Sequence, residues 1–177
     1  VVSINIPGTY VTNERLRQTL VDAVATYNIR PNQIELEITE TSYVDNIEEA
    51  IQAVLQFRQL GFLVAIDDFG TGVSSLSYLK MLAVTTLKID KSFIDGIPHS
   101  KKDSAIIKGI ISLASSLRLN VVVEGVEDIE QANYINDNFE NTLIQGYFYS
   151  KPLPTEELEN FFKQLQRRRE KMITVDI

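Results

Sequence analysis

The sequence has no cysteine and only one histidine among its 177 residues. Without cysteine, disulfides, thiolate metal sites and cysteine nucleophiles are all excluded. The absence of disulfides fits a reducing cytoplasm, where we expect the domain to reside, although other segments could anchor the parent protein to the inner membrane. His99 lies between Pro98 and Ser100 in a predicted surface loop, which argues against histidine as a general base.

Long apolar runs and excess positive charge are also absent. No run approaches the roughly 20 apolar residues that span a bilayer, and residues 1–7 lack the basic start and apolar segment of a signal peptide. The net charge of −7 argues against binding to a nucleic-acid polymer, which requires a cationic surface. A small phosphate ligand remains compatible with this charge if bound cations supply the positive charge.

The chain instead shows alternating strand and helix patterns over residues 1–177, without a linker that would divide it. Strand-like runs occur near residues 2–6, 34–38, 62–67, 85–89, 120–124 and 142–145. Helical patterns lie near residues 12–26, 47–60, 103–117 and 128–137, and a last helix begins near residue 155. This alternation predicts a single α/β domain with a parallel sheet.

The side-chain parity of the strands favours a barrel over an open sheet. In the run 34–38, Ile34 and Leu36 share one face while Glu35 and Glu37 share the other. An open sheet covered by helices on both faces should be apolar on both. A TIM-like (β/α) barrel has an interior that could carry these charges, but its eight strands usually need about 250 residues. We therefore expect a barrel that lacks its first strands in this chain.

Most strand-like runs end on a polar residue that could bind a metal. These ends are Asn5, Glu37, Asp67-Asp68, Lys88 with Asp90, Glu124 and Gln145. Because the carboxyl ends of barrel strands meet at one rim, these oxygen donors could converge around a divalent cation. Each also has a purely structural interpretation: a turn residue, a helix cap, or a buried ion pair between Lys88 and either Glu37 or Asp90.

The order of these residues resembles the EAL domain of bacterial cyclic di-GMP phosphodiesterases. The matching motifs are Glu37-Ile-Thr-Glu40, Asp67-Asp-Phe-Gly-Thr-Gly72 with Ser74-Ser-Leu76, Leu87-Lys-Ile-Asp90, Glu124-Gly-Val-Glu127, and Gln145-Gly-Tyr147 ahead of Lys151-Pro152. The resemblance runs from Asn5 to Pro154. It implies an EAL-type barrel that hydrolyses cyclic di-GMP to linear pGpG with Mg²⁺ or Mn²⁺, using two ions.

The resemblance also implies roles for individual residues. Asn5, Glu37 and Glu124 would be metal ligands, while Asp67 would bridge the two ions and Asp68 would bind the second. Lys88 would polarise the attacking water or stabilise phosphoryl charge. Asp90 would be a further metal contact or would orient Lys88.

Further roles concern the loops and the substrate. Glu40 would anchor the loop after Asp68, and Gly70 and Gly72 would give that loop the freedom to position the acids and to contribute to a homodimer contact. Gln145 would contact the substrate. Glu127 would contact a metal-binding residue without binding the metal itself, or would simply be an acid at the start of a helix.

The sequence departs from the family pattern in two places, and these departures affect the activity that we expect. The Glu-Ala-Leu motif that names the family, whose Glu is a ligand, is absent and is expected upstream of Val1 with about two strands. Val73 stands where an aromatic residue is usual. We therefore expect the segment alone to be weakly active or inactive, and the parent to carry sensory or GGDEF-type domains.

Two other functions are also compatible with the sequence. One is a cyclic di-GMP receptor or regulatory domain without hydrolysis. The other is a different metal-dependent barrel enzyme, for example one that forms enolates, which would explain acids at strand ends but not the ordered loop motifs.

Overall fold

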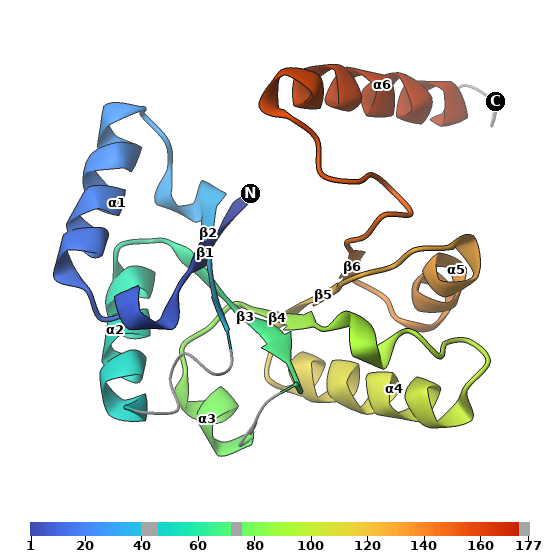
Figure 1. Ribbon diagram of the computed structural model, residues 1–177, viewed down its shortest axis with the longest axis horizontal. Coiled ribbons are helices and arrows are strands. Elements are labelled where there is room, and N and C mark those ends of the chain that lie inside the picture. The colour runs from blue at the N-terminus through green and yellow to red at the C-terminus, as the bar shows by residue number, and fades with distance from the viewer. Residues whose placement is uncertain (40–45, 72–75, 174–177) are drawn as a thin grey trace.

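A computed structural model describes residues 1–39, 46–71 and 76–173, which contain one parallel sheet (Figure 1). Its strands are β1 (Val2–Ile6), β2 (Ile34–Thr39), β3 (Leu63–Phe69), β4 (Thr86–Ile89), β5 (Asn120–Val123) and β6 (Thr142–Ile144). They lie side by side in sequence order, and each is parallel to the next. This arrangement confirms the predicted β/α alternation and is that of part of a TIM-like barrel.

Helices connect the successive strands and lie around the sheet, and a last helix follows the final strand at a distance from the sheet (Figure 1). They are α1 (Glu14–Thr26), α2 (Ile47–Gln59), α3 (Leu76–Met81), α4 (Lys101–Ser116), α5 (Ile129–Asn138) and α6 (Thr155–Ile173), with the 3₁₀ turns η1 (Gly8–Tyr10), η2 (Pro31–Gln33) and η4 (Lys91–Phe93). The five longer helices confirm the predicted ones within about two residues. The sequence pattern missed α3 and the 3₁₀ turns because they are too short to show a helical period. No helix in the described ranges is long and apolar enough to cross a membrane.

The helix starts follow from local side-chain chemistry. The side chains of Asn46, Ser100 and Asp128 each accept a hydrogen bond from a backbone N–H in the first turn of α2, α4 and α5. Such caps satisfy donors that have no partner within the helix. They explain why these helices begin directly after the loops at the C-terminal ends of strands.

The two faces of the sheet differ as strand parity predicts. The face toward the helices is apolar: Leu36, Val64 and Leu87 are fully buried there. The opposite face carries the polar residues Glu37 and Lys88, which are also buried. The barrel interior is therefore polar, and every charge in it needs a partner.

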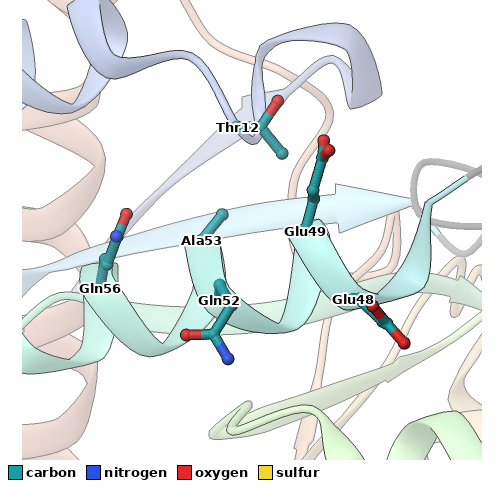
Figure 2. Close-up of a pocket in the computed structure, with 6 residues that line it drawn as sticks. All are labelled: Thr12, Glu48, Glu49, Gln52, Ala53 and Gln56. Carbon is teal, nitrogen blue, oxygen red and sulfur yellow. The ribbon is translucent and has the colours of Figure 1, made fainter.

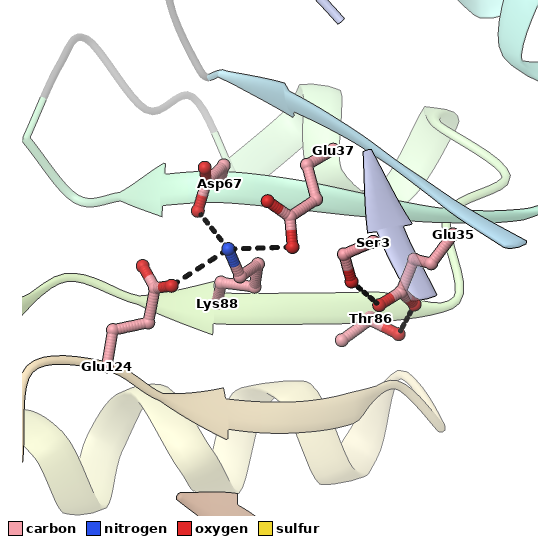
Figure 3. Close-up of polar contacts among 7 residues, drawn as sticks. All are labelled: Ser3, Glu35, Glu37, Asp67, Thr86, Lys88 and Glu124. Carbon is pink, nitrogen blue, oxygen red and sulfur yellow. Dashed lines mark hydrogen bonds and ion pairs between the residues drawn. The ribbon is translucent and has the colours of Figure 1, made fainter. Parts of the chain in front are cut away.

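One interior carboxylate is satisfied by neutral groups. Glu35 accepts hydrogen bonds from the Thr86 hydroxyl at 2.5 Å and from the Ser3 hydroxyl at 3.4 Å. Figure 3 shows these three residues toward the N-terminal ends of the strands, away from the charged group described below. Their hydrogen bonds make a structural layer of the interior.

The loop after β6 approaches the loop after β5 closely at Gly146. Val126 donates its N–H to the Gln145 carbonyl at 3.1 Å, and Phe148 donates to the Val126 carbonyl at 3.0 Å. A methyl group on Gly146 would overlap the Val126 backbone. The close contact of these two loops thus depends on the absence of a side chain at Gly146.

We expect Gly146→Ala to lower the free energy of unfolding by about 1–3 kcal/mol, because backbone atoms must move to admit the methyl group. Gly109→Ala is the matched control, since Gly109 lies within α4 with nothing near its added methyl group. There the same change should raise stability by about 0.5–1 kcal/mol. Urea unfolding of both variants tests this, and a shift in the same direction for both would contradict it.

Candidate metal centre

A buried lysine stands among three carboxylates at the C-terminal ends of the strands (Figure 3). Lys88 Nζ of β4 lies 2.8 Å from Glu37 Oε1 of β2, 2.9 Å from Asp67 Oδ1 of β3, and 2.8 Å from Glu124 Oε1, directly after β5. Lys88 is 4% exposed and Glu37 is 6% exposed. Four polar side chains that are distant in sequence therefore meet at one rim, as the strand ends predict.

The charges in this cluster do not balance. Burial alone would lower the pKa of Lys88, but its contacts with Glu124, Glu37 and Asp67 outweigh burial and raise that pKa. Burial raises the pKa of Glu124 to about 7, and nearby Asp67 adds to the rise, which Lys88 offsets only in part. One ammonium group is too little for this many carboxylates, so a divalent cation would relieve their repulsion.

Asp67 and Asp68 share this rim because the end of β3 is irregular. In a regular strand, neighbouring side chains point to opposite faces. Here the register shifts between Ile66 and Phe69, and Asp68 adopts a positive φ of 53°. Carboxylate oxygens of Asp67, Asp68 and Glu124 consequently lie within 4.8 Å of one another. The sequence shows that the two acids are adjacent, but its pattern did not predict the bulge that brings both to one side of the sheet.

The donors in this group fit a hard divalent cation. Such ions prefer several carboxylate oxygens. Asp67 Oδ1 is buried and accepts no hydrogen bond in the described part of the chain, so its contact with Lys88 Nζ is an ion pair without hydrogen-bond geometry. Burial, followed by the charges of Asp67 and Asp90, raises the pKa of Asp68, which again shows a local excess of negative charge.

Two further predicted ligands, Glu37 and Asn5, lie on the same face of the sheet as Asp67. Glu37 contacts Lys88, so the ion pair considered from the sequence is present. Asn5 is opposite Glu37 in the β1–β2 register, which places it on the same face of the sheet, and it is exposed. The roles of both residues as ligands stay predictions.

Asp90 interacts with the following turn. Its carboxylate accepts the Ser92 N–H at 3.0 Å and so caps η4. Burial would raise the pKa of Asp90, but hydrogen bonds from Ser92 and Lys91 lower it. Among the described residues Asp90 makes no ion pair with Lys88, and its roles as a metal contact or in orienting Lys88 stay predictions.

Glu127 and Gln145 border a neighbouring cleft. Glu127 Oε1 lies 2.6 Å from Lys91 Nζ. Gln145 donates its N–H to the Val123 carbonyl at 2.9 Å and has an exposed side chain. A cleft of about 380 Å³ is lined by both residues together with Lys91, Gly125, Gly146 and Tyr147. This cleft adjoins Glu124 through Gly125, a location suited to a ligand that extends from the acidic cluster.

The remaining predicted residues belong to the loops. Gly70 has a φ of +96°, a backbone conformation that favours glycine. Glu40 and Gly72, as well as Val73, lie outside the described residues. Their predicted roles in anchoring and shaping the loop after Asp68 stay predictions.

A second cavity, on the helical layer, has the wrong chemistry for a phosphate ester. It measures about 520 Å³ and lies beside α2 (Figure 2). Its lining contains the acids Glu48 and Glu49 and the neutral residues Thr12, Gln52, Ala53 and Gln56. With two carboxylates and no cation in its lining, it would repel a phosphate.

A parallel α/β barrel sheet with an acidic cluster at the C-terminal rim defines a class of divalent-cation-binding barrel domains. Comparison of the sequence with known protein families identifies the family. The sequence profile of the EAL domain matches residues 1–152. The chain belongs to the EAL domain family.

Relatives and solved structures agree with this assignment. The chain is 45% identical over 130 residues to "Cyclic di-GMP phosphodiesterase NbdA" of Pseudomonas aeruginosa, and the match covers 73% of the chain and 16% of NbdA. The structure "PaMucR Phosphodiesterase, c-di-GMP complex" has a TM-score of 0.81 at 33% identity, with coverage of 88% of this chain and 63% of that one. The Klebsiella pneumoniae BlrP1 "manganese/cy-diGMP complex" has a TM-score of 0.78 at 28% identity, with coverage of 85% and 38%.

Lys88→Met tests the charge balance of the cluster. In the presence of EDTA we expect a loss of about 3–5 kcal/mol of stability, because the carboxylates lose their buried cation. Added Mn²⁺ should recover part of that loss by replacing the missing positive charge. Urea unfolding in EDTA and in Mn²⁺ measures the difference, with Lys108→Met on the exposed side of α4 as the control. Equal destabilisation in the two conditions would refute the expected coupling.

Proposed function

We propose that the protein containing this chain hydrolyses cyclic di-GMP to linear pGpG in second-messenger signalling. The observation that carries the proposal is the convergence of Glu37, Asp67 and Glu124 on Lys88, with Asp68 beside them. The names of NbdA and of the PaMucR complex support the choice of substrate. The chain spans 16% of the length of NbdA, so the proposal concerns the intact protein.

The proposed cofactor is a pair of Mg²⁺ or Mn²⁺ ions. Asp67, Asp68 and Glu124 would hold the ions, and Glu37 and Asn5 would add oxygen donors. The oxygen-only donor set and the manganese in the BlrP1 complex support this choice. When bound, the ions supply an activated water and neutralise charge on the phosphodiester.

Lys88 acts as a fixed positive charge in this scheme. Its raised pKa keeps the amine protonated, so it serves as a hydrogen-bond donor and not as a base. Its ammonium group, at the rim beside Asp67 and Glu124, would donate a hydrogen bond to a phosphoryl oxygen of the substrate. It then stabilises the charge that grows on that oxygen as water attacks phosphorus and the opposite ribose oxygen leaves.

The cleft beside Glu124 supplies room for the rest of the substrate. The exposed side chain of Gln145 lies at its edge and offers both a donor and an acceptor to a guanine or a phosphate. Tyr147 and Lys151 stand close by, with Lys151 Nζ 5.8 Å from the centre of the Tyr147 ring. Lys151 and Tyr147 would thus add a positive charge and a ring surface near the edge of the cleft.

Asp67→Asn in the intact protein tests the proposed role of Asp67 in holding the ions. The variant keeps the shape of the side chain but removes the charge that would hold two cations. We expect the rate of pGpG formation to fall at least about 100-fold, as for the loss of a group that stabilises the transition state. Chromatographic detection of pGpG with Mg²⁺ or Mn²⁺ measures the rate. Glu48→Gln, which removes an exposed charge on α2, should leave it unchanged.

Three outcomes would contradict parts of the proposal. Equal turnover by Asp67→Asn and the natural protein would refute the role of Asp67. Binding of cyclic di-GMP without pGpG formation would support a receptor. Absence of binding would favour a different metal-dependent barrel enzyme.

A further inference from the structure

The acids at the rim are followed by glycines whose missing side chains leave space for other residues. Gly70 comes two residues after Asp68, and Gly125 directly follows Glu124. Their φ angles of +96° and +69° both lie in the region that favours glycine. In both cases, a residue of η4 occupies the space where a side chain would otherwise project.

The contacts are close on both sides of η4. A methyl group on Gly70 would lie 2.5 Å from Phe93 Cζ, so the phenyl ring packs directly on the loop after β3. A methyl group on Gly125 would lie 2.5 Å from Lys91 Cβ, so the aliphatic part of Lys91 packs on the loop after β5. The turn therefore lies between the two loops that carry the acids.

Several polar contacts hold η4 in this place. Asp90 caps it through the Ser92 N–H, as described above. Lys91 forms an ion pair with Glu127 at 2.6 Å, and the Glu127 N–H donates to Gln131 Oε1 at 2.9 Å. Gln131 is buried, and its Nε2 donates to the Ile94 carbonyl at 3.2 Å, directly after the turn. Both ends of the turn are thus tied to neighbouring elements.

We propose that η4 is a spacer that sets the distance between Asp67-Asp68 and Glu124. The inference rests on the proposed metal site, which requires these carboxylates to converge. Phe93 and Lys91 are positioning residues: they act on the ligand-bearing loops through Gly70 and Gly125. Small displacements of a ligand weaken a metal site strongly, because coordination requires each oxygen at a set distance.

Phe93→Ala in the intact protein tests the spacer. Removal of the ring lets the loop after β3 move, so we expect the Mn²⁺ affinity of the folded protein to fall about 10- to 100-fold, as for residues that support metal ligands. Isothermal titration with Mn²⁺ alone measures the affinity without reference to turnover. Circular dichroism at the titration temperature establishes that the variant is folded, and Phe93→Leu, which fills part of the space, provides a second variant with a smaller expected loss.

Phe57→Ala and Phe57→Leu are matched controls. Phe57 is a buried phenylalanine of α2 that packs edge-on against Phe62 in the helical layer. These variants should lose stability but keep the Mn²⁺ affinity of the folded protein. If the Phe57 and Phe93 variants lose affinity equally, the effect is general to core packing and the spacer inference is overturned.

Variants of Lys91 separate packing from charge. Lys91→Met keeps the aliphatic contact with Gly125 and removes the ion pair, so it should bind Mn²⁺ more tightly than Lys91→Gly, which removes both. Equal affinities for these two variants would refute the role of the aliphatic contact. If the natural protein itself does not bind Mn²⁺, the proposed metal site fails. If it binds and the Phe93 variants bind equally well, only the spacer inference fails.

Discussion

The rest of the site depends on the burial of Lys88 among carboxylates. A lysine inside a barrel is costly unless acids compensate it, and acids at that depth are equally costly without a cation. Glu37, Asp67 and Glu124 come from three different segments, so their shared contact with Lys88 links the ends of the central strands. The remaining negative charge is what makes the group receptive to further cations. A site in perfect charge balance would gain little from binding a metal.

An irregularity in the backbone of β3 then brings a further acid, Asp68, to this charged group. A continuous β3 would separate Asp67 from Asp68, whereas the bulge and the positive φ of Asp68 direct both to one rim. A non-glycine residue in that conformation is uncommon, so the surrounding structure must stabilise it. The contact of Gly70 with Phe93 is part of that surrounding structure. The local geometry of the acids thus depends on a turn that follows a different strand.

The sequence was sufficient to predict the strands, the longer helices and the rim on which the acids meet. Period-two parity separated Leu36 from Glu37, and the common direction of parallel strands placed their ends together. It was insufficient for the bulge at Asp68 and for η4, because single φ angles and close glycine contacts leave no periodic pattern. A signal was nevertheless present, since Gly70 and Gly125 each follow an acid closely. Their spacing could have indicated that other residues pack against these loops.

Glu35 and Glu37 show where parity alone stops being informative. Both are buried acids on the same face of β2, two residues apart, and the strand pattern treats them as equivalent. Their partners distinguish them. Hydroxyl groups of Ser3 and Thr86 satisfy Glu35, whereas Glu37 faces the ammonium group of Lys88 within a cluster that has unbalanced charge. Neutral partners satisfy Glu35 without a cation, whereas Glu37 depends on a charged partner that it shares with Asp67 and Glu124.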